Sequence, residues 1–507
     1  MQNYKTIVIV GAGVSGLTAG IYAEQHGFHA ILLEKNPSVG GMCTGWYRDG
    51  FYIDGCVHWL TGTKEGTMLN EMWHNLDVIK DQKDILYLDS WGTFEYGGEK
   101  VTLWCDLDRA EKEWKELSPI DSKRIHKFFN MVRDFKKVEL PVDLPVSLIP
   151  LNRKLKLGFQ ILPIWPSFLA TMRIKRTDFA NKFKSPVIRF ALNHAQSGDG
   201  NLFSMIYSYA SISNGDGGIP MGASKPMVER MKEKFLSLGG TLKLNANVEQ
   251  IMIENKRATG VKLKNGEIIE GDYVVTCLDT NYVLKKLLRD QYPFPAFEKR
   301  ISDVKRYPSP GCVLINYSVC LDNNLPIPYS FTCKPFKVAN KEISHITVRS
   351  YSYDPTFTRG DKTVLSVLIN QSGDDYAFWR ELAKDKEQYR RYKEWLVEQV
   401  NERIFKRFPH LKESLSILDV CTPHTFNRYV NSTNGVFMGF FFTARDGRFS
   451  HSGRLRGISN LYLSGQWLQG PGGLPLALTQ GKFAIQRICK RENLSYVFSP
   501  IPKKKKA

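Results

Sequence analysis

The chain has 507 residues, of which 42% are hydrophobic and 24% charged, and its formal net charge is +19. Because single cores usually stop growing at about 250–300 residues, two or more folded domains are expected, and the composition excludes a disordered or collagen-like chain. The nine cysteines are scattered without a C-x-x-C pair. This pattern predicts reduced thiols in a cytosolic protein, with neither a disulfide framework nor a metal site.

The chain opens with a strand, a glycine turn, a helix and a second strand. Residues 6–10 form an apolar run without alternation, which predicts a strand buried on both faces of a parallel sheet. A helix is expected over 15–26, ended by Gly27, and a strand over 30–34. The early first strand leaves no room for a signal peptide, and no apolar run reaches the about 18 residues that a transmembrane helix needs.

The turn after the first strand carries a dinucleotide-binding pattern. Gly11, Gly13 and Gly16 form G-x-G-x-x-G, in which the glycines make the turn, admit a pyrophosphate and let helix and strand pack closely. Glu34 closes the second strand, where a carboxylate accepts hydrogen bonds from ribose hydroxyls and disfavours a 2′-phosphate. The sequence therefore predicts an adenine dinucleotide, FAD or NAD, at this end of the chain.

Two further blocks resemble parts of the same α/β unit. In the middle block we expect a turn at 218–222 and a helix from Pro226 to Gly239, whose buried stripe repeats every fourth residue. Strands follow over 241–244, 248–253, 259–263 and 273–276, with a type I′ turn at Asn265-Gly266 into 267–270. The last block is a strand over 461–463, a glycine turn and a helix over 477–489.

A basic, apolar segment runs from Leu140 to Met172. It is punctuated by prolines and contains Arg153, Lys154 and Lys156. Apolar side chains beside cations are typical of a segment that lies in a lipid headgroup layer; the alternative is a buried cap segment with a solvated basic edge. The lysines at 503–506 add to the positive charge as a solvated terminus. No nucleic-acid-binding module accompanies the charge, so we expect no nucleic-acid partner.

The residues after Glu34 resemble a flavoprotein family. Glu34-Lys35 followed by Gly40-Gly41 is similar to the E-K-x-x-x-x-G-G extension of the amine oxidase and phytoene desaturase superfamily. Residues 49–58 resemble the D-G-x-x-x-D-x-G-x-H stretch of retinol saturase and phytoene desaturase-like proteins, with the penultimate glycine moved. Residues 220–222 with Val248 and 260–263, and then residues 465–474, are similar to the middle and carboxy-terminal motifs of that family.

The resemblance implies FAD as the cofactor and assigns its contacts. Val248 is expected at the adenine side through its backbone, and Gly465 with the turn at 472–474 near the ribityl chain and flavin. The full expected FAD set is Gly11, Ala12, Gly13, Ser15, Gly16, Glu34, Lys35, Gly40, Gly41, Met42, Val248, Gly465, Gly472, Gly473 and Leu474. Met42 departs from the arginine that amine oxidases usually carry, which favours the desaturase and saturase branch over amine oxidation.

The expected fold is α/β, with a discontinuous Rossmann-like FAD-binding domain and a substrate domain of mixed β-sheet and helices. The FAD-binding pieces are 1–77, 206–285 and 426–492, the substrate pieces 78–205 and 286–425, and a basic tail covers 493–507. Alternatives for the apolar run at 436–442 are a core strand and a lipid tunnel lining.

The expected reaction is oxidation or reduction of a carbon–carbon bond in a hydrophobic isoprenoid or lipid. NAD(P)H is one possible electron donor. His58 is the candidate acid or base because imidazole titrates near neutrality; its alternative is a structural hydrogen bond. Other readings are a flavin-dependent polyene isomerase, an amine oxidase-like enzyme, and a lipid-binding protein without flavin, as Rab GDP-dissociation inhibitors exemplify. The protein is expected in the cytoplasm, in peripheral contact with a membrane surface.

Overall fold

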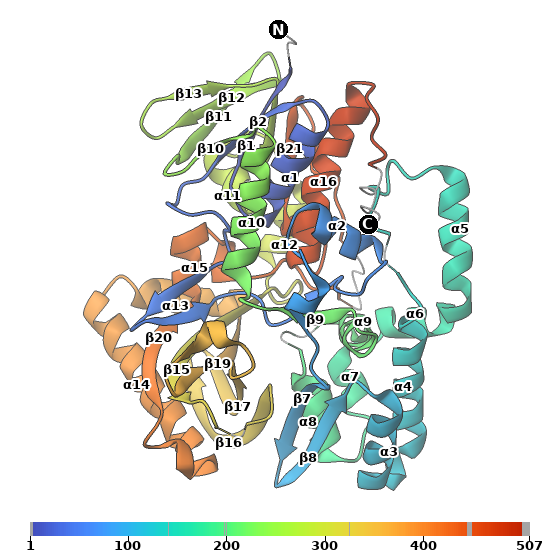
Figure 1. Ribbon diagram of the computed structural model, residues 1–507, viewed down its shortest axis with the longest axis vertical. Coiled ribbons are helices and arrows are strands. Elements are labelled where there is room, and N and C mark those ends of the chain that lie inside the picture. The colour runs from blue at the N-terminus through green and yellow to red at the C-terminus, as the bar shows by residue number, and fades with distance from the viewer. Residues whose placement is uncertain are drawn as a thin grey trace.

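A computed structural model describes residues 4–139, 141–196, 198, 200–323, 325–443 and 449–498. Leu140 and the lysines at 503–506 lie outside the described residues. A five-stranded parallel sheet confirms the expected Rossmann-like unit (Figure 1). Its order is β10 (Thr241–Lys243), β2 (His29–Leu33), β1 (Thr6–Val10), β14 (Tyr273–Thr276) and β21 (Leu461–Leu463). Three separate parts of the chain therefore build one sheet.

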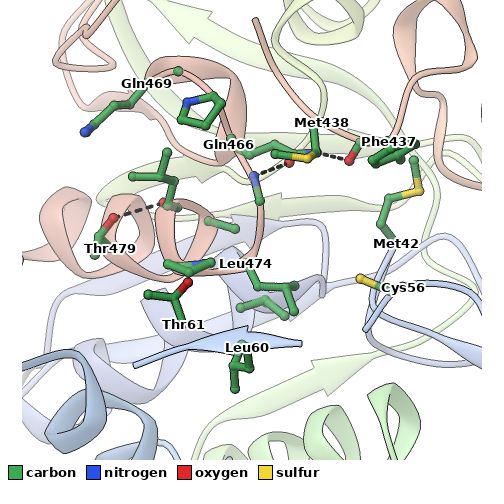
Figure 2. A pocket seen from close by; sticks show the side chains of 18 of the residues that line it. Met42, Cys56, Leu60, Thr61, Phe437, Met438, Gln466, Gln469, Leu474 and Thr479 are labelled. Carbon is green, nitrogen blue, oxygen red and sulfur yellow. Dashed lines mark hydrogen bonds between the residues drawn. The ribbon is translucent and has the colours of Figure 1, made fainter. Parts of the chain in front are cut away.

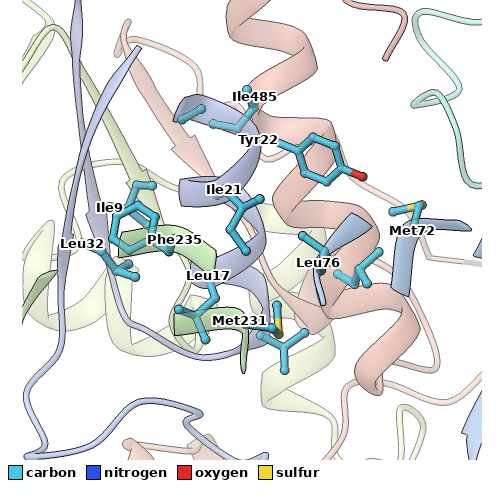
Figure 3. Close-up of a cluster of buried hydrophobic side chains, with 14 of the residues drawn as sticks. Ile9, Leu17, Ile21, Tyr22, Leu32, Met72, Leu76, Met231, Phe235 and Ile485 are labelled. Carbon is cyan, nitrogen blue, oxygen red and sulfur yellow. The ribbon is translucent and has the colours of Figure 1, made fainter. Parts of the chain in front are cut away.

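Three helices cover one face of this sheet. They are α1 (Val14–Gln25), α10 (Ser224–Ser237) and α16 (Leu474–Arg491), and α1 packs against both of the others. Figure 3 shows the core between them, where Leu17, Ile21, Phe235 and Ile485 are fully buried. Gly27 ends the first helix region with a φ of 79°, as expected for a glycine after a helix. The last helix begins at Leu474 instead of 477, because Pro475 is compatible with a first helical turn.

An antiparallel ribbon covers the other face, and it corrects one turn. It consists of β11 (Val248–Glu254), β12 (Arg257–Leu263) and β13 (Ile268–Glu270). The expected type I′ turn at Asn265-Gly266 is wrong, because only Gly266 has a positive φ (91°) and the Gly266 N–H bonds the carbonyl of Leu263. The expected turn at 218–222 is also partly wrong, since Gly217–Pro220 is strand β9.

A second, mixed sheet draws strands from both stretches between the dinucleotide-binding blocks. Its order is β20 (Ser416–Cys421), β15 (Pro310–Cys320), β19 (Lys362–Ser372), β17 (Lys341–Ser350), β16 (Tyr329–Val338), β7 (Ser90–Tyr96) and β8 (Glu99–Trp104), with β18 (Thr358–Arg359) beside β19. One face packs on α13 (Tyr376–Leu382) and α14 (Lys386–Arg407) to form a core of its own. The other face is left for the cavity described below.

A helical layer completes the second half of the molecule (Figure 1). It contains α3 (Leu107–Leu117), α4 (Ser122–Phe135), α5 (Leu151–Ile161), α6 (Trp165–Arg173), α7 (Arg176–Ala180), α8 (Pro186–His194) and α9 (Leu202–Ser213). Helix α9 runs across the expected division at 205/206 and packs against α4 and α6. A division that follows the packing would lie after α9, and we keep the domain scheme as a proposal.

Short elements connect these layers. They are β3 (Gly45–Arg48), β4 (Phe51–Asp54), β5 (Leu60–Thr61), α2 (Met68–Asn75), β6 (Ile85–Leu86), α11 (Thr280–Tyr282), α12 (Pro295–Ser302) and α15 (Pro423–Val430). All nine cysteines are free thiols. Among the described helices, none has both the length and the apolarity to cross a bilayer.

Candidate functional site

One cavity of about 1400 Å³ extends from the carboxyl edge of the parallel sheet to the mixed sheet. Its wall contains most of the residues expected to hold FAD: Gly11, Gly13, Ser15, Glu34, Lys35, Gly40, Gly41, Met42, Val248, Gly465, Gly472, Gly473 and Leu474. His58 lines it as well. Ala12 and Gly16 are not part of the wall; they support the glycine loop from behind.

The glycine loop leaves space on the cavity side and none on the protein side. A Cβ on Gly16 would lie 1.9 Å from the carbonyl oxygen of Gly11, so this glycine is required for the helix to pack on the strand. A Cβ on Gly13 would make only ordinary van der Waals contacts of 3.7–4.0 Å with the backbone of Gly40 and Gly41, and φ of Gly13 is an ordinary −73°. Gly13 therefore keeps the cavity open, where the start of helix α1 offers N–H groups to an anion.

Glu34 directly follows β2, and only 5% of its surface is exposed. One carboxylate oxygen accepts the N–H of Ala12 and the other the N–H of Asn36, both at 2.9 Å. Because each oxygen has a second lone pair, the carboxylate still has acceptor capacity toward the cavity. Glu34 thus both braces the glycine loop and presents an acceptor for hydroxyl groups.

The remaining residues of the first block take different positions. The Lys35 ammonium donates to the Asn431 side chain (3.1 Å), just after α15, and burial lowers the pKa of this lysine. Met42 packs beside Phe437, between the dinucleotide-binding end and the mixed sheet (Figure 2). Val248 follows Ala246, whose N–H donates to the backbone oxygen of Glu34 (2.8 Å), so this segment closes the cavity near the second strand.

The carboxy-terminal turn is shaped by a side chain that the sequence did not single out. Gln466 accepts the N–H of Gly473 (2.9 Å) and donates to the carbonyl of Phe437 (3.1 Å), as Figure 2 shows. Gly472 and Gly473 have φ values of 93° and 90°, which favour glycine. The hydroxyls of Ser15 and Ser464 lie 2.8 Å apart and join this block to helix α1. Only a motif alignment would have identified Gln466.

The loop that carries His58 is held by a buried carboxylate. Asp54 is 3% exposed and accepts the N–H groups of Cys56, Val57 and Ser224 at 2.7–2.8 Å. Burial and the Arg349 guanidinium lower the pKa of His58 to about 3. These surroundings favour the uncharged ring and argue against titration near neutrality; the role of His58 as acid or base stays a prediction.

Apolar side chains form the rest of the wall. The run at 436–442 is not a strand; Phe437, Met438, Phe441 and Phe442 line the cavity, as in the tunnel alternative, while Phe440 is in the core. Phe135, Phe168 and Phe203 from the helical layer line the wall too. These helical residues carry no local motif, because they meet only in the tertiary structure.

The arrangement fits an adenine dinucleotide. The glycine loop, the Glu34 carboxylate with its remaining acceptor capacity and the glycine-rich turn at 472–474 border one continuous space. Such a site binds the diphosphate at a helix start and the ribose at a carboxylate. The glycines would hold the diphosphate, Glu34 the ribose, and the turn at 472–474 the flavin end.

Comparison with known proteins agrees with this geometry. Phytoene desaturase (lycopene-forming) of Paracoccus sp. (strain N81106 / MBIC 01143) is 27% identical over 294 residues, which are 56% of this chain and 56% of that protein. Chloroplastic prolycopene isomerase of Daucus carota is 23% identical over 86% of this chain and 72% of its own length. An oxidoreductase from Methanosarcina mazei shares the fold, with a TM-score of 0.57, 16% identity and coverage of 95% of this chain and 100% of its own.

A family model, flavin containing amine oxidoreductase, matches residues 14–489. The match begins after the first strand and after Gly11 and Gly13, and it includes the middle and carboxy-terminal blocks and both intervening stretches. The family implies FAD. The chain belongs to the flavin-containing amine oxidoreductase family.

Proposed function

We propose that the protein is an FAD-dependent oxidoreductase that acts on a carbon–carbon single or double bond of a hydrophobic isoprenoid or lipid. The observation that carries the proposal is the continuity of the cavity, which joins the dinucleotide-binding residues to an apolar chamber. FAD, when bound, supplies the two-electron chemistry. The chain's own residues orient the substrate and exclude water from it.

The size and lining of the cavity support a long apolar substrate. Pockets for small ligands typically measure about 300–1,000 Å³, and this cavity of about 1400 Å³ has room for a dinucleotide and further chain. Aromatic side chains from α4, α6 and α9 line it together with the carboxy-terminal run at 436–442, and Phe203 of α9 contacts Phe442 with ring centroids 5.8 Å apart. The desaturase and isomerase relatives bear names that refer to polyenes, in line with this substrate class.

Amine oxidation is disfavoured by charge. Arg349 lines the chamber, and a guanidinium repels the ammonium form of an amine substrate. Met42 also replaces the arginine usual in amine oxidases. A polyene isomerase on the same scaffold is the second candidate, favoured by the prolycopene isomerase relative.

The test is anaerobic stopped-flow spectroscopy of the purified protein with NADH, NADPH and a panel of isoprenoids. We expect a yellow protein whose flavin absorbance is bleached by one partner. Bleaching by a nicotinamide would indicate a saturase with NAD(P)H as donor, and bleaching by the isoprenoid a desaturase. Isomerised product without net bleaching would select the isomerase. A colourless protein that takes up no FAD would overturn the proposal and leave the lipid-binding reading.

We also propose that α5 docks the protein on an anionic membrane. None of the residues of α5 is buried, and Leu151, Leu155 and Phe159 are 73%, 58% and 69% exposed. Lys154 and Lys156 are exposed among them, which suits an anionic headgroup layer. The helix stands at the edge of the molecule in Figure 1, and its Leu157 and Ile161 line the cavity. A lipid could thus pass from a bilayer into the chamber beside this helix.

Liposome flotation tests the docking. We expect binding to vesicles that contain phosphatidylserine, weaker at high salt, and loss of binding in Leu155→Asp/Phe159→Asp. A matched pair at exposed positions elsewhere, Ile268→Asp with Ile417→Asp, should bind normally. Equal flotation of the α5 variant and the wild-type protein would refute the docking surface.

A further inference from the structure

One strand of the mixed sheet presents polar side chains to an otherwise apolar chamber. In β17, Ile346 and Val348 are buried in the core on one face, at 0% and 1% exposure. The alternate residues Thr347 and Arg349 line the cavity on the other face. His345 shares that face and contacts His194, another residue of the wall, with ring centroids 3.9 Å apart.

Neighbouring strands extend this polar floor. Ser366 of β19 lies directly opposite Arg349, and Ser330 of β16 lies opposite Thr347. The hydroxyls of Ser330 and Thr347 are 2.8 Å apart. The side-chain oxygen of Asn370, also on the wall, is buried without a hydrogen-bond partner. A pure hydrocarbon chain would leave all these groups without a ligand partner.

Arg349 forms no ion pair within the part of the chain that the structure describes, because no carboxylate oxygen there lies within 4.0 Å of its guanidinium. Its polar partners are uncharged: the backbone oxygen of His58, at a long 3.4 Å, and the side chain of Tyr353. The side chain of His58 beside it carries no compensating negative charge. Charges in a low-dielectric cavity are normally paired, because removing them from water is costly. The cavity thus contains a cation with the geometry for a planar anion, and the carboxylates that line the same wall (Glu34, Glu139, Asp216 and Asp279) form no ion pair with it.

We propose that the chamber binds a long hydrophobic molecule that ends in a carboxylate, with the carboxylate on Arg349. A guanidinium and a carboxylate match as a two-pronged pair, and the Thr347 hydroxyl on the same face of the strand is a further hydrogen-bonding group when Ser330 donates to it. The Ser366 hydroxyl already donates its proton to the Asn316 side chain (2.6 Å). This inference rests on the proposed function for its hydrophobic substrate and adds the end group. The shared chemistry is that of a long-chain acid, from either an isoprenoid or a fatty acid.

The experiment compares acids with their matched alcohols on the FAD-loaded protein. Quenching of tryptophan fluorescence is a direct readout, since Trp59 and Trp91 line the cavity. The probes are retinoic acid against retinol, and oleic acid against oleyl alcohol. Because a hydrogen-bonded charge pair contributes about 1.5–3 kcal/mol, each acid should bind about 10- to 100-fold tighter than its alcohol. If the acid-over-alcohol preference is larger for the retinoid pair, the ligand class is an isoprenoid acid; if it is larger for the oleyl pair, the ligand class is a fatty acid.

Variants locate the preference. Arg349→Gln should remove it, and Arg349→Lys should retain part of it. Lys299→Gln, which removes an exposed cation of α12 outside the cavity, should leave it intact. Thermal unfolding and flavin absorbance of each variant show whether the fold and the cofactor are preserved.

The outcomes separate this inference from the proposed function. Equal binding of acids and alcohols by the yellow wild-type protein would overturn the acid subsite and leave the oxidoreductase proposal standing. A preference that survives in a folded Arg349→Gln protein would also overturn it. Arg349-dependent acid binding by a protein that takes up no FAD would support the subsite and refute the oxidoreductase.

Discussion

The two ends of the cavity are built in different ways. The dinucleotide-binding end is built mainly from backbone: glycines at a helix start and a glycine-rich turn, with one side chain, the carboxylate of Glu34. Each of these features lies within a short segment of the chain. The chamber end uses side chains from the mixed sheet, the helical layer and the run at 436–442, which are distant in sequence. The comparison teaches that a diphosphate needs close backbone approach, which only a glycine spacing permits, whereas an apolar chamber needs volume, which many sequences fill.

The largest effect should separate packing from binding within the glycine loop. Gly16→Ala places a Cβ 1.9 Å from the Gly11 carbonyl oxygen and should lower the free energy of unfolding by about 3 kcal/mol. The shortest contact of the new Cβ in Gly13→Ala is 3.7 Å, so the stability of this variant without FAD should match the wild type, while FAD affinity falls at least about tenfold. Chemical denaturation and FAD titration measure both. Equal destabilisation by the two variants would contradict this division of roles.

The second-largest effect is expected at Glu34, the carboxylate at the end of the second strand. Glu34→Gln removes a charged acceptor from the Ala12 N–H and the ribose side, which should weaken FAD binding about 10- to 100-fold. Fluorescence of released flavin in equilibrium dialysis measures the change. Glu254→Gln, at an exposed position at the end of β11, is the matched control. Unchanged FAD occupancy in Glu34→Gln would remove the basis of the dinucleotide assignment.

The histidines beside the chamber should make the stability of the protein depend on pH. Burial lowers the pKa of His194 to about 2 and of His345 to about 4. The unfolded chain binds protons at these histidines below about pH 6.5 and the folded chain does not, so the free energy of unfolding falls as the pH drops from 7 to 5.

His345→Gln should therefore lose less stability over that interval, by about 1–2 kcal/mol at pH 5. Denaturation at pH 7 and pH 5 measures it, with exposed His410→Gln as the control. Parallel pH dependence of His345→Gln and wild type would show that the chamber is hydrated enough to charge these rings.

The smallest effect is expected at His58. With its pKa near 3, the ring is uncharged at pH 7 and has almost no capacity to exchange protons there. His58→Gln should change the rate of substrate-dependent flavin bleaching by less than about threefold, whereas loss of an acid or base costs about 10²–10⁴-fold. A loss in that range, with a changed pH–rate profile, would restore His58 as the acid or base.

Sequence reasoning located much of the parallel sheet and of the cofactor end. The strand at 6–10 coincides with β1, and the stripe Met227, Met231 and Phe235 is buried in α10 as expected. The errors are local: the turn at Asn265 and the start of α16 depend on one residue's φ and on one proline. Arg349 was missed, although polar residues alternate with Ile346 and Val348 in its strand. Alternation shows two faces but does not show what each face meets.

The sequence by itself predicted the strand–turn–helix–strand unit and the carboxylate that follows its second strand, because a tight turn, a phosphate approach and a ribose contact each demand particular residues at fixed spacing. Only the tertiary structure decided that the mixed sheet turns one face into a chamber, that α5 stays exposed, and that His58 is uncharged beside Arg349. Burial and the electrostatics of a cavity are sums over residues that are far apart in the chain, and no local pattern contains them.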